Sequence, residues 1–275
     1  MAEERISIVT DEIAQDVDTV AKFLDEHRLR AVEIRTAGGR RVPNVPAAVW
    51  EDLWKRARKE GWRVVAVSPG IFKGHHSDAD RMRKEIEETL PETIARAEEI
   101  RAKNIIVFGF LAGSHEDFPE QVVGALRQAV ELCASSKLKV LLENEPGSFA
   151  DTGEKTRKLI DAVNHPNLAA NWDPCNSGIF NNPAKLSDGA RSLGEYIGHV
   201  HVKDGCPVMG SLFARYGPIV TGRLGWRDHL LALKEVGYRG WFGIETHFEP
   251  LYESSAVLLG ELRALLKDVG FWEDE

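Results

Sequence analysis

Eight short runs of apolar and β-branched residues recur along the chain, and stretches with helical spacing of apolar residues lie between them. The strand-like runs are residues 5–10, 31–36, 63–68, 104–110, 138–145, 167–173, 197–204 and 241–246. The helical stretches are 18–29, 92–100, 118–136, 154–163, 226–237 and 255–269. Strands that alternate with helices form a parallel sheet, and eight such units in about 250 residues predict an α/β chain that folds as a single (β/α)8 TIM barrel over residues 1–275. An open doubly wound sheet is disfavoured, because no GxGxxG or GxxxxGK(S/T) motif follows any run.

The charge balance narrows the choice of partners. With 35 Lys and Arg against 43 Asp and Glu, the chain carries a formal net charge of -8, whereas nucleic-acid and anionic-membrane binding need a basic surface. We therefore expect no nucleic-acid partner and no membrane partner, and no stretch is apolar enough to span a bilayer. Three cysteines without a CxxC pair, Cys133, Cys175 and Cys206, favour a reducing, cytoplasmic setting.

Ionisable residues stand at the ends of four consecutive strand-like runs. Glu143 and Asp173 lie at the ends of the fifth and sixth runs, His201 lies in the seventh, and Glu245 lies near the end of the eighth. Side chains alternate between the two faces of a strand, and the neighbours of these residues are apolar, as Val200 is to His201. This parity predicts that all four side chains point into the mouth of the barrel, where TIM barrels carry their sites.

Three carboxylates and an imidazole in such a place are costly to bury without a common partner, and they form a suitable ligand set for a divalent metal ion. Mn²⁺ is the expected ion, and Mg²⁺, Co²⁺ or Zn²⁺ would also fit, although no thiolate is placed to favour zinc. Each residue also has a structural alternative: helix or turn capping for Glu143 and Asp173, a structural histidine for His201, and an arginine pair for Glu245. Their common position at four strand ends favours the metal site.

Other inward-facing residues are candidates for substrate binding. Lys203, in the seventh run, would contact substrate or pair with Asp173 or Asp204. Glu33 and Arg35 point inward from the second run, either toward substrate or, as we expect, into a buried ion pair with one another.

Loop residues add further candidates. Lys73 and His75 follow the third run, and Arg223 lies with Arg215 in the long segment 204–226 after the seventh. Each would contact substrate or remain a solvated surface residue.

Residues beside the predicted ligands are expected to orient them. Asn144, Glu145 and His247 hold these positions. Near the C-terminal end, Phe271 and Trp272 would serve either a subunit contact in a homo-oligomer or packing on the barrel itself.

Several segments resemble the xylose isomerase-like TIM-barrel superfamily. They are LLENEPGS, NLAANWDPCN, IGHVHVKDG and GYRGWFGIETH, and the segments TDEIAQD and AVEIRTAGG resemble its sugar phosphate isomerase/epimerase branch. The superfamily holds a metal ion with a glutamate, an aspartate, a histidine and a glutamate from strands five to eight. The resemblance assigns these roles to Glu143, Asp173, His201 and Glu245.

The resemblance implies a divalent-metal-dependent isomerase or epimerase that acts on a sugar, keto-sugar or sugar phosphate. Proton transfer would pass through an enediolate, with Glu143 and Glu245 as base and acid. An inosose-type dehydratase, which would take a polyol-like substrate at the same metal site, and a non-catalytic binding barrel are the alternatives.

Two positions depart from the pattern of similar epimerases. Asn176 stands where they often have a histidine that contacts substrate hydroxyls, so we expect Asn176 to contact substrate. The loop after the seventh run reads TGRLGW, with Arg223, in place of an acidic GEG-like turn. Both departures leave the sugar and the type of reaction open.

Overall fold

A closed barrel of eight parallel strands forms the centre of the protein, in the order β1, β12, β9, β8, β7, β6, β5, β2. The computed structural model describes residues 4–178, 186–207 and 214–272. The barrel strands are β1 (Ile6–Val9), β2 (Ala31–Ile34), β5 (Arg63–Val67), β6 (Asn104–Phe108), β7 (Lys139–Glu143), β8 (Leu168–Trp172), β9 (Ile197–Val202) and β12 (Trp241–Ile244). All eight predicted strand regions and the (β/α)8 fold are thereby confirmed.

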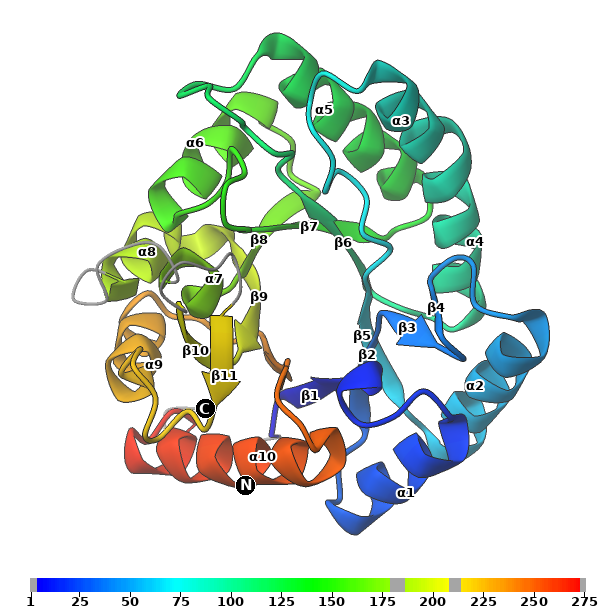
Figure 1. The fold of residues 1–275 in the computed structure, drawn as a ribbon, viewed down its shortest axis with the longest axis vertical. Coiled ribbons are helices and arrows are strands. Elements are labelled where there is room, and N and C mark those ends of the chain that lie inside the picture. The colour runs from blue at the N-terminus through cyan, green and yellow to red at the C-terminus, as the bar shows by residue number, and fades with distance from the viewer. Residues whose placement is uncertain (1–3, 179–185, 208–213, 273–275) are drawn as a thin grey trace.

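Helices form a ring outside the strands (Figure 1). The α-helices are α1 (Val17–Glu26), α2 (Ala47–Glu60), α3 (Ala79–Lys84), α4 (Leu90–Glu99), α5 (Glu120–Ser135), α6 (Gly153–Val163), α7 (Pro174–Gly178), α8 (Leu186–Leu193), α9 (Trp226–Glu235) and α10 (Leu251–Asp268). The described residues also include short 3-10 segments at Thr10–Glu12 and Gly194–Tyr196 and a π-helical turn at Glu85–Thr89. Within the described part of the chain, no helix is both long and apolar enough to cross a membrane.

The six predicted helical stretches correspond to α1, α4, α5, α6, α9 and α10. Helix α2 is not among them, because its buried side chains Trp50, Leu53 and Ala57 are spaced out among charged ones. Its stability therefore depends on packing against the barrel rather than on a wide apolar stripe.

Two short hairpins lie at the ends of barrel strands. After β2, strand β3 (Thr36–Ala37) pairs antiparallel with β4 (Arg40–Arg41). After β9, strand β10 (Asp204–Pro207) pairs with β11 (Ala214–Gly217). The segment 204–226, expected to be a long loop, therefore contains a hairpin, and residues 208–213 within it lie outside the described residues.

The barrel interior is apolar on one side and polar on the other. On the polar side, Glu33 from β2 faces His199 and His201 from β9, and all three are buried. The apolar side is a small cluster contributed by β5 to β8, formed by Ala66, Ile106, Phe108, Leu141 and Ala169. Buried polar groups need partners. The buried Glu33, His199 and His201 therefore indicate a functional site on the polar side of the barrel interior.

The first and last strands meet to close the barrel. Ile6 and Ile8 of β1 are in register with Phe242 and Ile244 of β12. Phe271, from the C-terminal end, packs edge-on against Phe242 with ring centroids 5.2 Å apart and is almost fully buried. For Phe271 the structure thus shows packing on the chain's own barrel.

Candidate metal and substrate site

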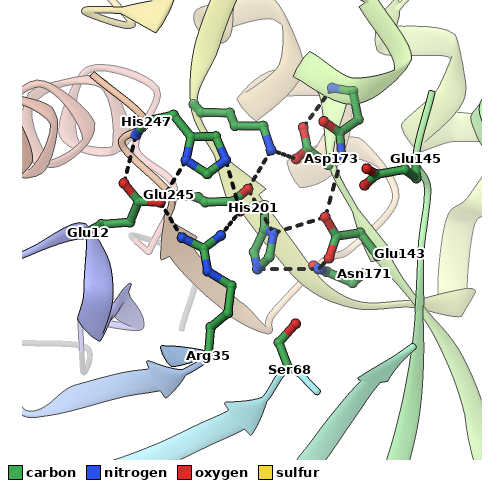
Figure 2. Close-up of polar contacts among 12 residues, drawn as sticks. Glu12, Arg35, Ser68, Glu143, Glu145, Asn171, Asp173, His201, Glu245 and His247 are labelled. Carbon is green, nitrogen blue, oxygen red and sulfur yellow. Dashed lines mark hydrogen bonds and ion pairs between the residues drawn. The ribbon is translucent and has the colours of Figure 1, made fainter. Parts of the chain in front are cut away.

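Four side chains from neighbouring strands converge at one end of the barrel (Figure 2). Glu143 ends β7, Asp173 follows β8, His201 lies in β9, and Glu245 follows β12. Each offers one nitrogen or oxygen atom, and these four atoms lie within 4.8 Å of one another. All four residues are buried. We call them the four-residue cluster.

The His201 ring is oriented by hydrogen bonds and charges on both of its nitrogens. Its Nε2 lies 2.9 Å from a carboxylate oxygen of Glu33. Its Nδ1 faces Glu245 Oε2 at 3.4 Å and Glu143 Oε1 at 3.6 Å, without forming a hydrogen bond. Burial alone would lower the pKa of His201, but the carboxylates of Glu33, Glu143 and Glu245 raise it well above its ordinary value.

Three asparagines hold Glu143 and Asp173 in place through side-chain and backbone hydrogen bonds. Asn171 donates to Glu143 Oε2 at 3.2 Å, and Asn176 donates to Glu143 Oε1 at 3.3 Å. Asn144 exchanges two hydrogen bonds with the backbone of Asp173, at 2.7 and 2.8 Å, and the backbone N–H of Asn176 donates to Asp173 Oδ1. This orienting role was expected of Asn144, whereas Asn176 contacts a proposed ligand rather than only facing the substrate space.

Lys203 lies between two carboxylates of the cluster. Its ammonium is 2.7 Å from Asp173 Oδ2, and it also donates to Glu245. Asp204, the other expected partner, instead accepts the backbone N–H groups of Arg223 and Leu224. Burial alone would lower the pKa of Lys203, but Asp173 and Glu245 raise it well above its ordinary value.

Glu245 is also tied to the N-terminal part of the chain. Its Oε1 accepts from Arg35 and lies 3.2 Å from His247 Nε2, and both of these side chains also contact Glu12. Burial alone would raise the pKa of Glu245, but Lys203, His247 and His201 lower it well below its ordinary value.

The prediction that Glu33 and Arg35 form an ion pair with one another is wrong. Glu33 instead contacts His199 and His201, while Arg35 pairs with Asp11, Glu12 and Glu245. Both side chains do point inward, but Glu33 lies in β2 and Arg35 just beyond its end, so they contact different levels of the neighbouring strands.

A cavity of about 240 Å³ lies against the cluster. Its lining contains the predicted residues Glu33, Arg35, Lys73, Glu143, Asn176, His201, Lys203 and Glu245. Lys73 pairs with Glu145 at 3.1 Å. Among the described residues, Asp173 lies behind this lining, and neither His75 nor Arg223 belongs to it. His75 is exposed and contacts Ser77, and Arg223 lines a separate hollow beside the β10–β11 hairpin.

Among the described residues, five that line the cavity were not predicted as site residues: Thr36, Arg41, Ser68, Phe108 and Tyr216. Ser68 follows β5 directly, so the strand-end rule that found Glu143 would also have found it. Arg41 and Tyr216 belong to the two hairpins, and no local motif predicts that a hairpin returns to the cavity.

The donor set of the cluster fits a divalent metal ion. Buried oxygen and nitrogen donors face one another, and His201 Nδ1 lacks a hydrogen-bond partner. Glu33 on the opposite nitrogen is the kind of outer carboxylate that commonly orients a metal-bound histidine. A further group formed by Glu12, Glu245 and His247 shares Glu245 with the cluster.

Comparisons with known proteins agree with the fold. A family model described as the xylose isomerase-like TIM barrel matches residues 21–268. A 3-dehydroshikimate dehydratase from Bacillus anthracis is 34% identical over 85 residues, which cover 31% of this chain and 30% of that protein.

Two solved structures share the fold at low sequence identity. A D-allulose 3-epimerase from Methylomonas sp., solved in complex with D-allulose, is 14% identical with a TM-score of 0.74 and covers 96% of this chain and 98% of its own. An IOLI protein with a bound zinc atom is 16% identical with a TM-score of 0.77 and the same coverage of both chains.

Proposed function

The chain belongs to the xylose isomerase-like TIM-barrel family, and we propose that it is a divalent-metal-dependent isomerase or epimerase of a small sugar or keto-sugar. The convergence of Glu143, Asp173, His201 and Glu245 within 4.8 Å carries this proposal. Mn²⁺ is the proposed ion, because a site of three carboxylates and one imidazole suits it. The proposal includes a single domain over residues 1–275 and a cytoplasmic setting, in which the unpaired thiols of the three cysteines would stay reduced.

A bound divalent ion would supply Lewis acidity that polarises a substrate carbonyl. Glu143 removes the proton from the neighbouring carbon, and the electron pair of the broken C–H bond moves to the carbonyl to give an enediolate. Burial alone would raise the pKa of Glu143, but His201 lowers it, so the carboxylate is ionised and ready to act as a base. Glu245 returns a proton to the opposite face of the enediolate. Lys203, which donates a hydrogen bond to Glu245, is the adjacent source of that proton.

Isotope exchange tests this reaction. The metal-loaded protein is incubated in deuterated water with a panel of ketoses, and mass spectrometry follows deuterium incorporation at carbon. We expect exchange in the wild type and a loss of at least 100-fold in Glu143→Gln, while Glu154→Gln, on the exposed surface of α6, keeps the wild-type rate. If no substrate of the panel exchanges with metal present, a binding role replaces the enzyme proposal.

A second candidate reaction is a dehydration. The B. anthracis dehydratase match and Asn176, in place of the histidine of similar epimerases, favour it. The proton is removed in the same way, but the electron pair then expels a β-hydroxyl group, which leaves as water after it takes up a proton. Loss of 18 mass units from an inosose or a 3-hydroxy carbonyl compound, without epimerisation, would select this reaction over the first.

A further inference from the structure

Among the described residues, four arginine and lysine side chains line the cavity, and three of them have carboxylate partners. Arg35 contacts Glu12 and Glu245, Lys73 contacts Glu145, and Lys203 contacts Asp173 and Glu245. The fourth is Arg41, which has no carboxylate within 4.0 Å among residues 4–178, 186–207 and 214–272. A half-buried cation without a directly paired carboxylate is less stable than a paired one, and an anionic ligand would supply the missing partner.

The Arg41 guanidinium is held in one orientation. It belongs to the β3–β4 hairpin, where it pairs with Thr36. Its Nε donates to the carbonyl of Ser68 at 2.8 Å, and its Nη2 donates to Ser68 Oγ at 3.0 Å. Figure 2 shows Ser68, just beyond the end of β5, below the cluster with its side chain directed toward it.

Gly70 completes this support. A Cβ atom at Gly70 would lie 3.1 Å from Arg41 Cζ, and the backbone of Gly70 has a φ of +80°. The guanidinium therefore rests directly on the Gly70 backbone. A fixed guanidinium is well suited to an anion, because little side-chain entropy remains to be lost on binding.

Most of the donor capacity of Arg41 is still available. A guanidinium carries five N–H groups, and Ser68 takes one from Nε and one from Nη2. Burial lowers the pKa of Arg41 and the nearby charge of Arg35 lowers it further, while the carboxylates of Glu143, Asp11 and Glu245 offset this only in part. An anion placed against the guanidinium would relieve the remainder.

We infer that Arg41 binds an anionic group of the substrate, a carboxylate or a phosphate, and so restricts the protein to acidic sugars or polyols. The inference rests on the proposed function for the reacting end of the molecule, which the four-residue cluster would hold. The small volume of the cavity, about 240 Å³, favours a compact substrate whose anionic group is close to its reacting carbon. Guanidinium groups bind carboxylates and phosphates through two parallel hydrogen bonds, which would also fix the substrate's orientation.

Three matched probes test the inference: glycerate, glycerol 3-phosphate and glycerol, which share a three-carbon polyol and differ in the terminal group. Calorimetric titration of the metal-loaded wild type is expected to show at least tenfold tighter binding of one anionic probe than of glycerol, or about 1.4 kcal/mol. Tighter binding of glycerate assigns a carboxylate, and tighter binding of glycerol 3-phosphate assigns a phosphate. Equal affinity for all three probes would overturn the inference.

Two charge variants distinguish a specific effect of Arg41 on anion binding from an effect of net charge. Arg41→Gln is expected to abolish the preference for the anionic probe, whereas Arg40→Gln, an exposed neighbour on the same strand, keeps it with the same change in net charge. If Arg41→Gln still prefers the anion, the metal ion or another residue binds it, and the inference fails.

A wild-type crystal structure with the bound anion covers the case in which Arg41→Gln does not fold. The anionic group should lie within hydrogen-bond distance of Arg41, and any other position contradicts the inference. Deuterium exchange is a separate readout: anion preference without exchange would retain the Arg41 site and reject the proposed reaction, and exchange without anion preference would do the opposite.

Discussion

The Glu33 carboxylate contacts Nε2 of His201 at 2.9 Å, on the side of the ring opposite the carboxylates of Glu143 and Glu245. Burial alone would raise the pKa of Glu33, but His201 and His199 lower it to about 2. Glu33 is therefore ionised and can only accept a hydrogen bond, so His201 Nε2 must carry the proton. The other nitrogen, Nδ1, is thereby directed at the position where a cation would bind, and it must lose its own proton when one does.

Replacing Glu33 should weaken metal binding without removing any ligand. Glu33→Gln removes the charge that orients His201, and changes in such outer partners typically reduce metal affinity about 10–100-fold. Competition with a fluorescent chelator would measure the affinity. Glu85→Gln, a buried carboxylate that accepts the backbone N–H of Phe72 away from the cluster, controls for general destabilisation. Equal Mn²⁺ affinity in the wild type and Glu33→Gln would rule out this orienting role.

Removing one ligand should abolish stoichiometric metal binding. We expect Asp173→Asn to bind Mn²⁺ at least 100-fold more weakly, because the cluster loses both a donor atom and a negative charge. Elemental analysis of the purified proteins, together with metal titration, provides the measurement. Asp204→Asn is the matched control, since Asp204 is also buried and adjacent to Lys203 but is not part of the cluster. If the wild type stayed free of metal after incubation with each ion, the four residues would form a structural network and not a metal site.

Lys203 should stabilise the protein when no metal is bound. Lys203→Met leaves Asp173 and Glu245 with less counter-charge, and breaking a buried ion pair from one side typically costs about 3–5 kcal/mol. Urea unfolding with a chelator present should show this loss, and added Mn²⁺ should restore more stability in the variant than in the wild type. Lys73→Met, whose pair with Glu145 is about one-third exposed on both sides, should lose only about 0–1 kcal/mol. Unchanged stability of Lys203→Met in chelator would contradict the prediction.

Gly70 and Gly61 offer a matched test of the contact below Arg41. Both have positive φ, but a Cβ at Gly61 would meet nothing within 4 Å, whereas one at Gly70 would press on the guanidinium. Each Gly→Ala change should cost about 1 kcal/mol for the backbone alone. We expect Gly70→Ala to cost more and also to weaken binding of the anionic probe, as measured by unfolding and calorimetry. Equal losses of stability in Gly70→Ala and Gly61→Ala would mean that the Arg41 side chain moves aside without cost.

His229 should make stability depend on pH. Burial lowers the pKa of this residue on α9 to about 4, against about 6.5 in an unfolded chain. Between these values the unfolded chain binds a proton that the folded protein does not, so stability falls as pH falls from 6.5 to 4, by about 3 kcal/mol in total. The stability that depends on a neutral His229 is fully present above about pH 6.5.

Unfolding measured at pH 7 and pH 4.5 checks this dependence. His229→Leu should reduce the difference between the two pH values, while His75→Gln, at an exposed position, should keep the wild-type difference. An unchanged difference in His229→Leu would assign the pH dependence to other groups.

The barrel was predictable because its signal is repeated eight times. Each strand-like run ends within two residues of the observed strand, since apolar alternation and helix spacing both follow from burial in a layered fold. Face parity likewise predicted that Glu143, Asp173, His201 and Glu245 point inward, and these are the residues that the structure brings together.

Pairings between strands were not predictable in the same way. Parity indicates the face of a residue but not its height in the barrel, so Glu33 and Arg35 were expected to meet and instead contact different neighbours. Arg41 escaped prediction because its position depends on a hairpin that folds back toward Ser68, a contact between residues 27 positions apart.

The closure of the barrel between β1 and β12 sets the order in which the site is completed during synthesis. Glu33 and Arg35 leave the ribosome early, whereas Glu245 and His247 belong to the last strand region to emerge. Until β12 inserts beside β1, Arg35 and Lys203 lack the carboxylate that they share, and the ligand set has three members instead of four. A nascent chain that has not yet synthesised β12 therefore cannot assemble the full ion site, and four-ligand capture of a metal would mark a barrel that has closed.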